Sequence, residues 1–226
     1  RRAPGEEHTE LTEADAGPTL PRELKEFAGE GRYIEVDLAD APVTVASLYL
    51  PKGGLPADLQ EKMAKRMREA PDGGAKYDRK MRFLAGFAKQ LDRSRKAAAA
   101  AGREFVVMGD FNVAPRDEDV WDVAWFEGKT HVTEPERAAF QMLEEAGLEE
   151  VTRRFTEDQR YTYFDYKGMR FQKNEGMRID FQLASAPLAQ HVTGAQVDMV
   201  ERAGDKTSDH CPLLADFDLP DFDSVR

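Results

Sequence analysis

Short stretches of alternating or β-branched residues mark the predicted strands. Residues 33–38 (YIEVDL) alternate between apolar and polar side chains, and residues 43–49 (VTVASLY) are rich in β-forming residues. This pattern predicts two strands on either side of a turn at 40–42. The apolar run 106–108 (VVM) predicts a further, buried strand. Three more strand-like runs follow, at 178–184, 192–200 and 212–218.

Helical periodicity separates these strands. Apolar side chains recur on one helical face between Tyr77 and Leu91, which predicts a long helix over 76–101, ended by Gly102. A shorter helix is predicted over 55–69.

A second long helix is predicted around 134–146. Thr133 and Glu136 have the spacing of a capping box, and a proline lies in the first turn. Residues 1–31 are polar, contain proline and glycine, and are predicted to be mostly loop. Strands interleaved with long amphipathic helices indicate an α/β or layered α+β domain.

Composition limits the class of protein. A chain of 226 residues with 41% hydrophobic residues is long enough for one compact domain. No apolar run approaches the roughly 18 residues that a membrane span needs, so a soluble, cytoplasmic, monomeric protein is expected. The single cysteine, Cys211, enters an apolar run and is interpreted as a core residue.

Charge is unevenly distributed along the chain. The formal net charge of −11 argues against diffuse electrostatic attraction to nucleic acid. Residues 151–180, however, carry seven basic against five acidic side chains, so this segment is positive while the remainder is strongly negative. A local basic strip on an acidic body is therefore compatible with the sequence.

Polar residues at predicted strand ends are the candidates for chemistry, because a sheet fixes the backbone while the following loop frees the side chains. Asp110 and Asn112 flank a phenylalanine directly after the strand 106–108, Asp180 interrupts an apolar run, and His210 follows Ser208-Asp209. Taken singly, the first pair could form a turn, the second carboxylate could cap a loop, and the histidine could be structural. Three carboxylates buried together would need a cation, and oxygen ligands suit Mg²⁺ or Mn²⁺.

Three motifs resemble the endonuclease/exonuclease/phosphatase superfamily, and specifically its exonuclease III and abasic-site endonuclease branch. They are GDFNVAP at 109–115, YTYFDY at 161–166 with NEGMRIDFQLAS at 174–185, and SDHCPL at 208–213. The resemblance spans roughly residues 43–218. It implies a DNase I-like, four-layered α/β sandwich of two mixed β-sheets flanked by helices, with a metal-dependent site at one end of the sheets.

The resemblance also implies roles for individual residues. Asp110 would activate the attacking water, Asn112 would donate to a phosphate oxygen, Asp180 would hold His210 facing the phosphate, and Tyr49 would lie beside it. The implied metal ligands are Asp110, Asn112, Asp209 and His210.

The implied substrate is double-stranded DNA, especially its abasic sites and 3′ ends. Aromatic and basic residues interleave over 160–180, which suits stacking on sugars or bases and binding of phosphates. The candidate substrate-binding residues are Tyr163, Lys173, Met177, Arg178 and Ile179, although ordinary core packing is the alternative for the aromatic side chains. Trp121 and Trp125 are interpreted as packing residues, and His131 as a structural histidine.

Two features of the family pattern are missing. Neither a first strand ending in asparagine nor the metal-binding glutamate that follows it is present. Glu35 and Asp37 alternate with apolar residues and are expected to point away from the core. We therefore expect that the chain, from Arg1, lacks N-terminal strands of this domain and is inactive by itself.

The preferred hypothesis is a Mg²⁺-dependent DNA repair nuclease with 3′-to-5′ exonuclease and abasic-site endonuclease activity. One alternative is a phosphoesterase of the same fold that acts on lipid or inositol head groups, for which the segment 160–180 would be unnecessary. Another is a non-catalytic DNA-binding fragment.

Overall fold

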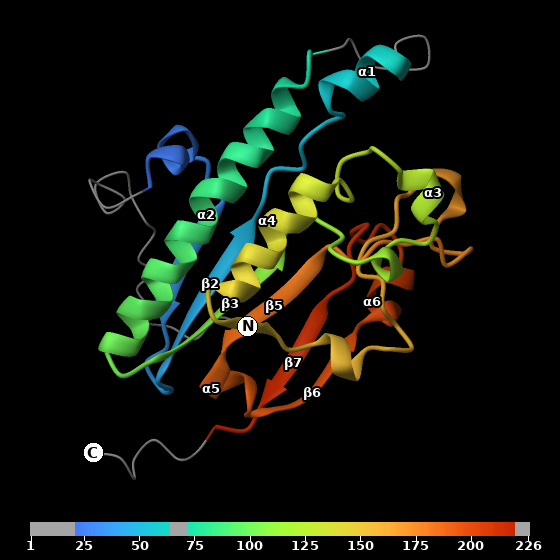
Figure 1. Ribbon diagram of the computed structural model, residues 1–226. Helices are drawn as coiled ribbons and strands as arrows, with labels where there is room; N and C mark the ends of the chain where they lie inside the picture. Colours follow the sequence, from blue (N-terminus) through green and yellow to red (C-terminus); the bar gives the residue numbers. More distant parts are fainter. Residues whose placement is uncertain (1–20, 64–71, 220–226) are drawn as a thin grey trace.

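A computed structural model describes residues 21–63 and 72–219 of the chain (Figure 1). Its strands are β1 (Tyr33–Asp37), β2 (Val43–Tyr49), β3 (Glu104–Asp110), β4 (Leu148–Glu150), β5 (Asp180–Ser185), β6 (Val192–Val197) and β7 (Leu213–Phe217). The α-helices are α1 (Ala57–Met63), α2 (Ala75–Ala100), α3 (Val123–Phe126), α4 (Glu134–Glu145), α5 (Ala186–Ala189) and α6 (Met199–Ala203). Four short 3-10 helices are η1 (Arg22–Phe27), η3 (Asp117–Asp119), η4 (Arg153–Phe155) and η5 (Lys167–Met169).

The strands form two sheets. Five strands lie in the order β1-β2-β3-β5-β4, with β2 and β3 parallel and the other neighbours antiparallel. Strands β6 and β7 form a separate antiparallel pair. In Figure 1, helices α2 and α4 cover one face of the larger sheet. The predicted α/β class, with two sheets and helices packed against them, is confirmed.

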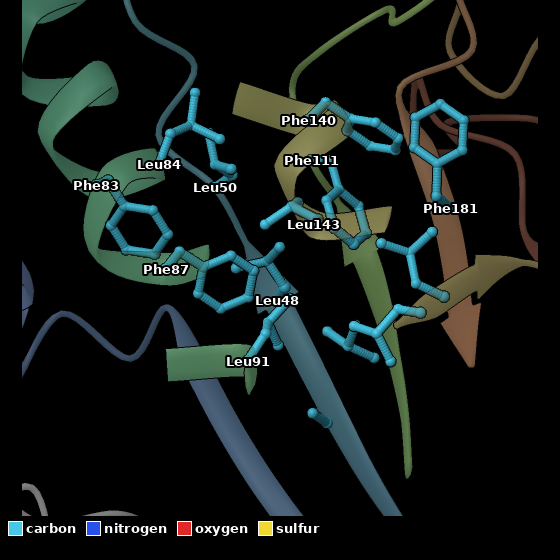
Figure 2. Packing of buried hydrophobic residues seen from close by; sticks show 14 of the residues in the cluster. Leu48, Leu50, Phe83, Leu84, Phe87, Leu91, Phe111, Phe140, Leu143 and Phe181 are labelled. Carbon is cyan, nitrogen blue, oxygen red and sulfur yellow. The ribbon is translucent and has the colours of Figure 1, made fainter. Parts of the chain in front are cut away.

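Each face of the larger sheet has its own core, because successive strand residues point to opposite faces. On the helical side, phenylalanines and leucines of α2 pack against Leu48, Phe111 and Phe181, together with Phe140 of α4 (Figure 2). On the opposite side, a second cluster joins apolar residues of the larger sheet to α5, β6 and the partly buried Phe217 of β7. The two sheets are therefore held face to face, and their rim is shared.

Most predicted elements are present, with bounds that differ by a few residues. The strand predicted at 192–200 is wrong at its end: β6 stops at Val197, and Asp198 caps α6 by accepting a hydrogen bond from the Glu201 backbone N–H at 2.9 Å. The helix predicted at 55–69 begins at Ala57, and its last part lies outside the described residues.

Two predictions about the N-terminal part are corrected. The loop predicted over 1–31 contains η1, whose Leu24 and Phe27 are buried against α2; residues 1–20 lie outside the described part. Glu35 faces helix α2, where it accepts hydrogen bonds from Tyr33 Oη at 2.7 Å and from the Ser94 hydroxyl. The prediction that Glu35 points away from the core is therefore wrong, because α2 covers the side of β1 on which the polar side chain lies.

No helix within residues 21–63 and 72–219 combines the length and the apolar character that crossing a bilayer requires.

Candidate active site

The sheet register brings three predicted residues into one row. Tyr49, the last residue of β2, is the parallel partner of Asp110, the last residue of β3. Asp110 is in turn the antiparallel partner of Asp180, the first residue of β5. Side chains at directly paired positions lie on the same face of a sheet, so all three point toward the side where β6 and β7 pack. Residues far apart in sequence therefore meet at one sheet end, and we call Tyr49, Asp110 and Asp180 the reactive row.

The turn after β3 holds Asp110 rigidly. The backbone N–H of Asn112 donates to Asp110 Oδ1 at 2.8 Å, and Asn112 Nδ2 donates to Asp110 Oδ2 at 2.7 Å. Phe111 points the other way into the helical-side core, where it contacts Phe140. Gly109 allows β2 and β3 to approach at this point, since a Cβ there would lie 2.0 Å from the Leu48 carbonyl oxygen.

The side chain of Asn112, the predicted phosphate donor, is engaged within the protein in this structure. Its side-chain amide also donates to the Leu50 carbonyl oxygen at 2.9 Å, so both Nδ2 hydrogens are used within the protein. The residue is 3% exposed and has a left-handed backbone, with φ of 50°. Its geometry instead orients the Asp110 carboxylate.

His210 reaches the row from the segment that precedes β7. Its Nδ1 donates to Asp180, with distances of 2.9 Å to Oδ2 and 3.1 Å to Oδ1. The ring of Tyr163 lies 4.9 Å from the imidazole, and the two residues also form a backbone bridge. Because Asp180 occupies Nδ1, the Nε2 atom is left as the ring nitrogen that can act on a ligand.

The electrostatics of the site are unbalanced toward negative charge. Burial, followed by the charge of Asp180, raises the pKa of Asp110 to about 7. Burial opposes the charged form of His210, but its hydrogen bond to Asp180 and the nearby carboxylates outweigh burial and raise its pKa. Burial, and then the charges of Asp165 and Asp209, raise the pKa of the Tyr163 hydroxyl, which therefore stays protonated. The site thus combines the Asp110 carboxyl, with a pKa near neutral pH, and the His210 imidazole, which favours its cationic form.

A buried polar network supports the turn from behind. The Asn112 carbonyl oxygen accepts hydrogen bonds from Lys80 Nζ of α2 and from His131 Nδ1, both at 2.6 Å. Lys80 also pairs with Glu136 at 2.5 Å, and both side chains are fully buried. Burial opposes the ionised form of Glu136, but the Lys80 ammonium outweighs burial and lowers its pKa. This network fixes the peptide that follows the reactive carboxylate.

His131 has the structural role that was predicted for it, because it is buried and uncharged. Burial, followed by the charge of Lys80, lowers its pKa to about 3. Lys80 was not predicted, and Glu136 was predicted only as the partner of Thr133 in a capping box, which is present. The available signal was the position of this lysine, one turn from Tyr77 and Leu84 on the apolar face of helix 76–101. A lysine is rarely fully buried without an acidic partner, so this position indicates a buried ion pair.

Comparison with known proteins agrees with this geometry. Residues 16–210 match the sequence profile of the Endonuclease/Exonuclease/phosphatase family, which is most of the chain. The chain belongs to this family. Exodeoxyribonuclease III of Haemophilus influenzae is 31% identical over 150 residues, which cover 63% of this chain and 55% of that protein.

Solved structures of nucleases and related enzymes share the family fold with this chain. An AP endonuclease from Archaeoglobus fulgidus superposes with a TM-score of 0.70 and 28% identity, over 86% of this chain and 68% of that one. A 3′ phosphatase from Neisseria, solved bound to product DNA hairpin, gives a TM-score of 0.68 and 28% identity, over 83% and 65% of the two chains. The chain spans between half and two thirds of the length of the curated exodeoxyribonucleases that it matches.

The metal site expected of this family is only partly supported by the residues in place. Burial and the charge of Asp180 raise the pKa of Asp110, so the site disfavours two ionised carboxylates side by side. Asp209 contributes negative charge near His210. However, within 21–63 and 72–219 no three His, Cys, Asp or Glu side chains are gathered closely enough to hold a metal ion. The charge of the site fits a divalent cation, whereas its ligand geometry is incomplete.

The residues predicted to bind substrate fall into separate groups. Met177 and Ile179 lie together in a small apolar cluster against which Tyr163 packs, next to His210. Lys173 is exposed at the surface.

The prediction for Arg178 is wrong. The side chain is fully buried, and its guanidinium donates to Thr152, Thr156 and the Arg160 carbonyl oxygen. It also pairs with Glu150 at 3.3 Å. Because the side chains of consecutive residues in extended backbone point in opposite directions, the arginine beside Met177 points away from the reactive row.

Cys211 is buried, and burial raises its pKa to about 12, so the thiol favours its neutral form, in agreement with a core residue.

Proposed function

We propose that this chain is the catalytic part of a DNA repair nuclease that releases nucleotides from 3′ ends of duplex DNA and incises at abasic sites. The observation that carries the proposal is the convergence of Tyr49, Asp110, Asp180 and His210 at the rim shared by the two sheets. The exodeoxyribonuclease and AP endonuclease relatives support it.

In the proposed reaction, Asp110 accepts a proton from the attacking water. A carboxylate with a pKa near 7 is well matched to general-base catalysis at neutral pH. Oxygen of the water then bonds to phosphorus as the bond between phosphorus and the 3′ oxygen breaks. The leaving oxygen takes up a proton and becomes a 3′-hydroxyl. Asn112 holds the Asp110 carboxylate in position through its backbone N–H and its side-chain amide.

His210 stabilises the negative charge that develops on the phosphate. Its raised pKa favours the imidazolium form, in which Nδ1 binds Asp180 and Nε2 donates a charge-assisted hydrogen bond. The Tyr49 hydroxyl lies in the same row, and 55% of the residue is exposed, so it can donate to a second phosphate oxygen.

A divalent cation, Mg²⁺ or Mn²⁺, belongs to the proposal as the cofactor. Asp209, whose charge lies near His210, would hold it on that side of the site. When bound, the ion would spread the negative charge of the phosphate.

The test uses the intact protein and two duplexes of the same sequence, one of which carries a single abasic site. With Mg²⁺ present we expect incision at the abasic site and shortening from 3′ ends, and EDTA should stop both reactions. The proposal is overturned if neither duplex is cut in Mg²⁺ or Mn²⁺. Hydrolysis of an inositol polyphosphate or of sphingomyelin by the same preparation would then favour a head-group phosphoesterase.

A further inference from the structure

Both tryptophans of the chain lie in one surface cluster with two cations. We call Trp121, Trp125, Lys129 and Arg170 the indole platform. The two indole rings are 6.0 Å apart and tilted by 40°. The Arg170 guanidinium lies 4.5 Å from the centre of the Trp121 ring, and Lys129 Nζ lies 4.2 Å from that of Trp125. The aromatic and cationic groups therefore form one continuous surface.

The platform is open to solvent. Trp125 is 52% exposed although Lys129 and Arg170 already lie near its ring, so the interpretation of this residue as a packing side chain is wrong. It sits in the four-residue helix α3, whose Asp122 cap accepts a hydrogen bond from the Trp125 backbone N–H. An exposed indole beside a second one has an energetic cost in water, which indicates a binding surface.

Backbone contacts connect the platform to the candidate active site. The Trp121 backbone N–H donates to the Gly176 carbonyl oxygen at 3.1 Å, and Val120 forms a bridge with Met177. Met177 bridges in turn to Tyr163, whose ring contacts His210. The backbone that carries Trp121 is thus connected through two neighbouring segments to the backbone that carries His210.

The two cations of the platform differ in their surroundings. The chain as a whole is strongly acidic, yet Lys129 and Arg170 lie within mutual electrostatic range, and burial, followed by the charge of Arg170, lowers the pKa of Lys129. Glu175 pairs with Arg170 and fixes its guanidinium over the indole. Glu175 thus neutralises Arg170 locally, and Lys129, whose ammonium lies over the Trp125 ring, is the cation of the platform that can meet a phosphate.

We propose that the indole platform stacks an unpaired nucleobase of a DNA end, with Lys129 facing a flanking phosphate. This inference rests on the proposed nuclease function and names a binding subsite for it. Bases inside a duplex are covered on both faces, so only an unpaired or frayed base can offer its ring to an exposed indole. The platform would thus recognise the single-stranded end of a substrate, separately from the reacting phosphate.

Tryptophan fluorescence tests the proposal directly, because the chain has two tryptophans and both belong to the platform. The chain of 226 residues is titrated in EDTA with an oligothymidylate of about eight nucleotides, a length within the usual site size. The control ligand is a base-free phosphodiester chain of the same length and charge. We expect the thymidylate to quench the emission at saturation and the base-free chain to leave it nearly unchanged. Equal responses to both ligands would overturn the proposal, since the contact would then involve phosphates alone.

Variants at Trp125 separate stacking from charge. Trp125→Ala should weaken thymidylate binding about tenfold by fluorescence anisotropy of a labelled strand, whereas Trp125→Phe should retain most of the affinity. Neither should alter the salt-dependent binding of the base-free chain. Loss of affinity for both ligands in Trp125→Ala, or no loss for either, contradicts base stacking. Thermal unfolding of each variant is the control for an intact fold.

The binding measurement distinguishes this inference from the proposed function. In EDTA it requires no turnover, so quenching without DNA hydrolysis would leave the platform standing while the nuclease proposal fails. Hydrolysis of DNA without base-dependent quenching would leave the nuclease proposal standing and overturn the proposal for the platform.

Discussion

The reactive row and the indole platform are built in contrasting ways. Tyr49, Asp110 and Asp180 stand on paired strands, and Lys80 supports the neighbouring turn from the interior. The platform stands on α3 and on the loop that carries Arg170, where exposed rings and cations lie against each other. Chemistry at phosphorus requires placement within a fraction of an ångström, whereas stacking tolerates adjustment. Substitutions in the row should therefore change turnover or stability strongly, and those near the platform should change affinity modestly.

The largest effect is expected for His210→Ala. Removal of the imidazole takes away a charged donor to the phosphate, and we expect kcat on an abasic duplex to fall about a thousandfold. The side chain is 30% exposed, so the free energy of unfolding should change little. Steady-state kinetics and urea unfolding on the same preparation measure the two quantities. A variant with full activity would contradict the role of His210.

Lys80→Met is expected to have the next largest effect, on stability through Glu136 and on turnover through Asn112. The substitution leaves the buried Glu136 carboxylate unpaired and should lower the free energy of unfolding by about 3 kcal/mol. It also removes one donor to the Asn112 carbonyl oxygen, so kcat should fall more than KM rises.

The double variant Lys80→Met with Glu136→Gln is the matched control for that substitution. Without a buried unpaired charge it should recover much of the stability, whereas kcat should stay low because the donor to Asn112 is still missing. Recovery of both quantities together would mean that Lys80 serves the fold alone.

Asp180→Asn should produce a smaller effect that depends on pH. The folded-state pKa of Asp110 lies near 7, above the usual 3.8, so its ionisation destabilises the protein as pH rises between these values. The raised pKa of His210 acts in the same direction, because its contribution is complete below about 6.5 and is lost as pH rises through the folded-state value. Both terms weaken when the Asp180 charge is removed.

Urea unfolding in EDTA at pH 5 and pH 8 measures this difference. The free energy of unfolding of the parent protein should fall between pH 5 and pH 8, and that of Asp180→Asn should fall by roughly 1 kcal/mol less. A difference between variant and parent that is independent of pH would show that Asp180 does not control the titration of Asp110 and His210.

The contrast between the two regions also explains what sequence could and could not reveal. Asp110, Asp180 and His210 follow recognisable motifs at strand ends, and the pairing of β3 with β5 places two of them opposite each other. Arg178 was misassigned because motif neighbours point to opposite faces of an extended chain. The clustering of Trp121 with Arg170 joins segments about fifty residues apart, and no local pattern encodes it. Residue type and spacing thus predict the row, while loop-built surfaces depend on tertiary contacts.

The smallest effect is expected for Lys173→Ala in the basic segment. Lys173 is exposed and lies outside the reactive row, so it can contribute only a phosphate contact. Loss of one such contact should weaken DNA binding about two- to threefold and reduce the slope of log affinity against log salt by about one. Anisotropy titrations of a labelled duplex at several salt concentrations measure both values. Arg178→Lys is the informative comparison, since its fully buried guanidinium should affect the free energy of unfolding and leave the salt slope unchanged. A changed salt slope in the buried variant would mean that charge in this segment acts on DNA through the fold as a whole, which would remove the distinction between the two regions.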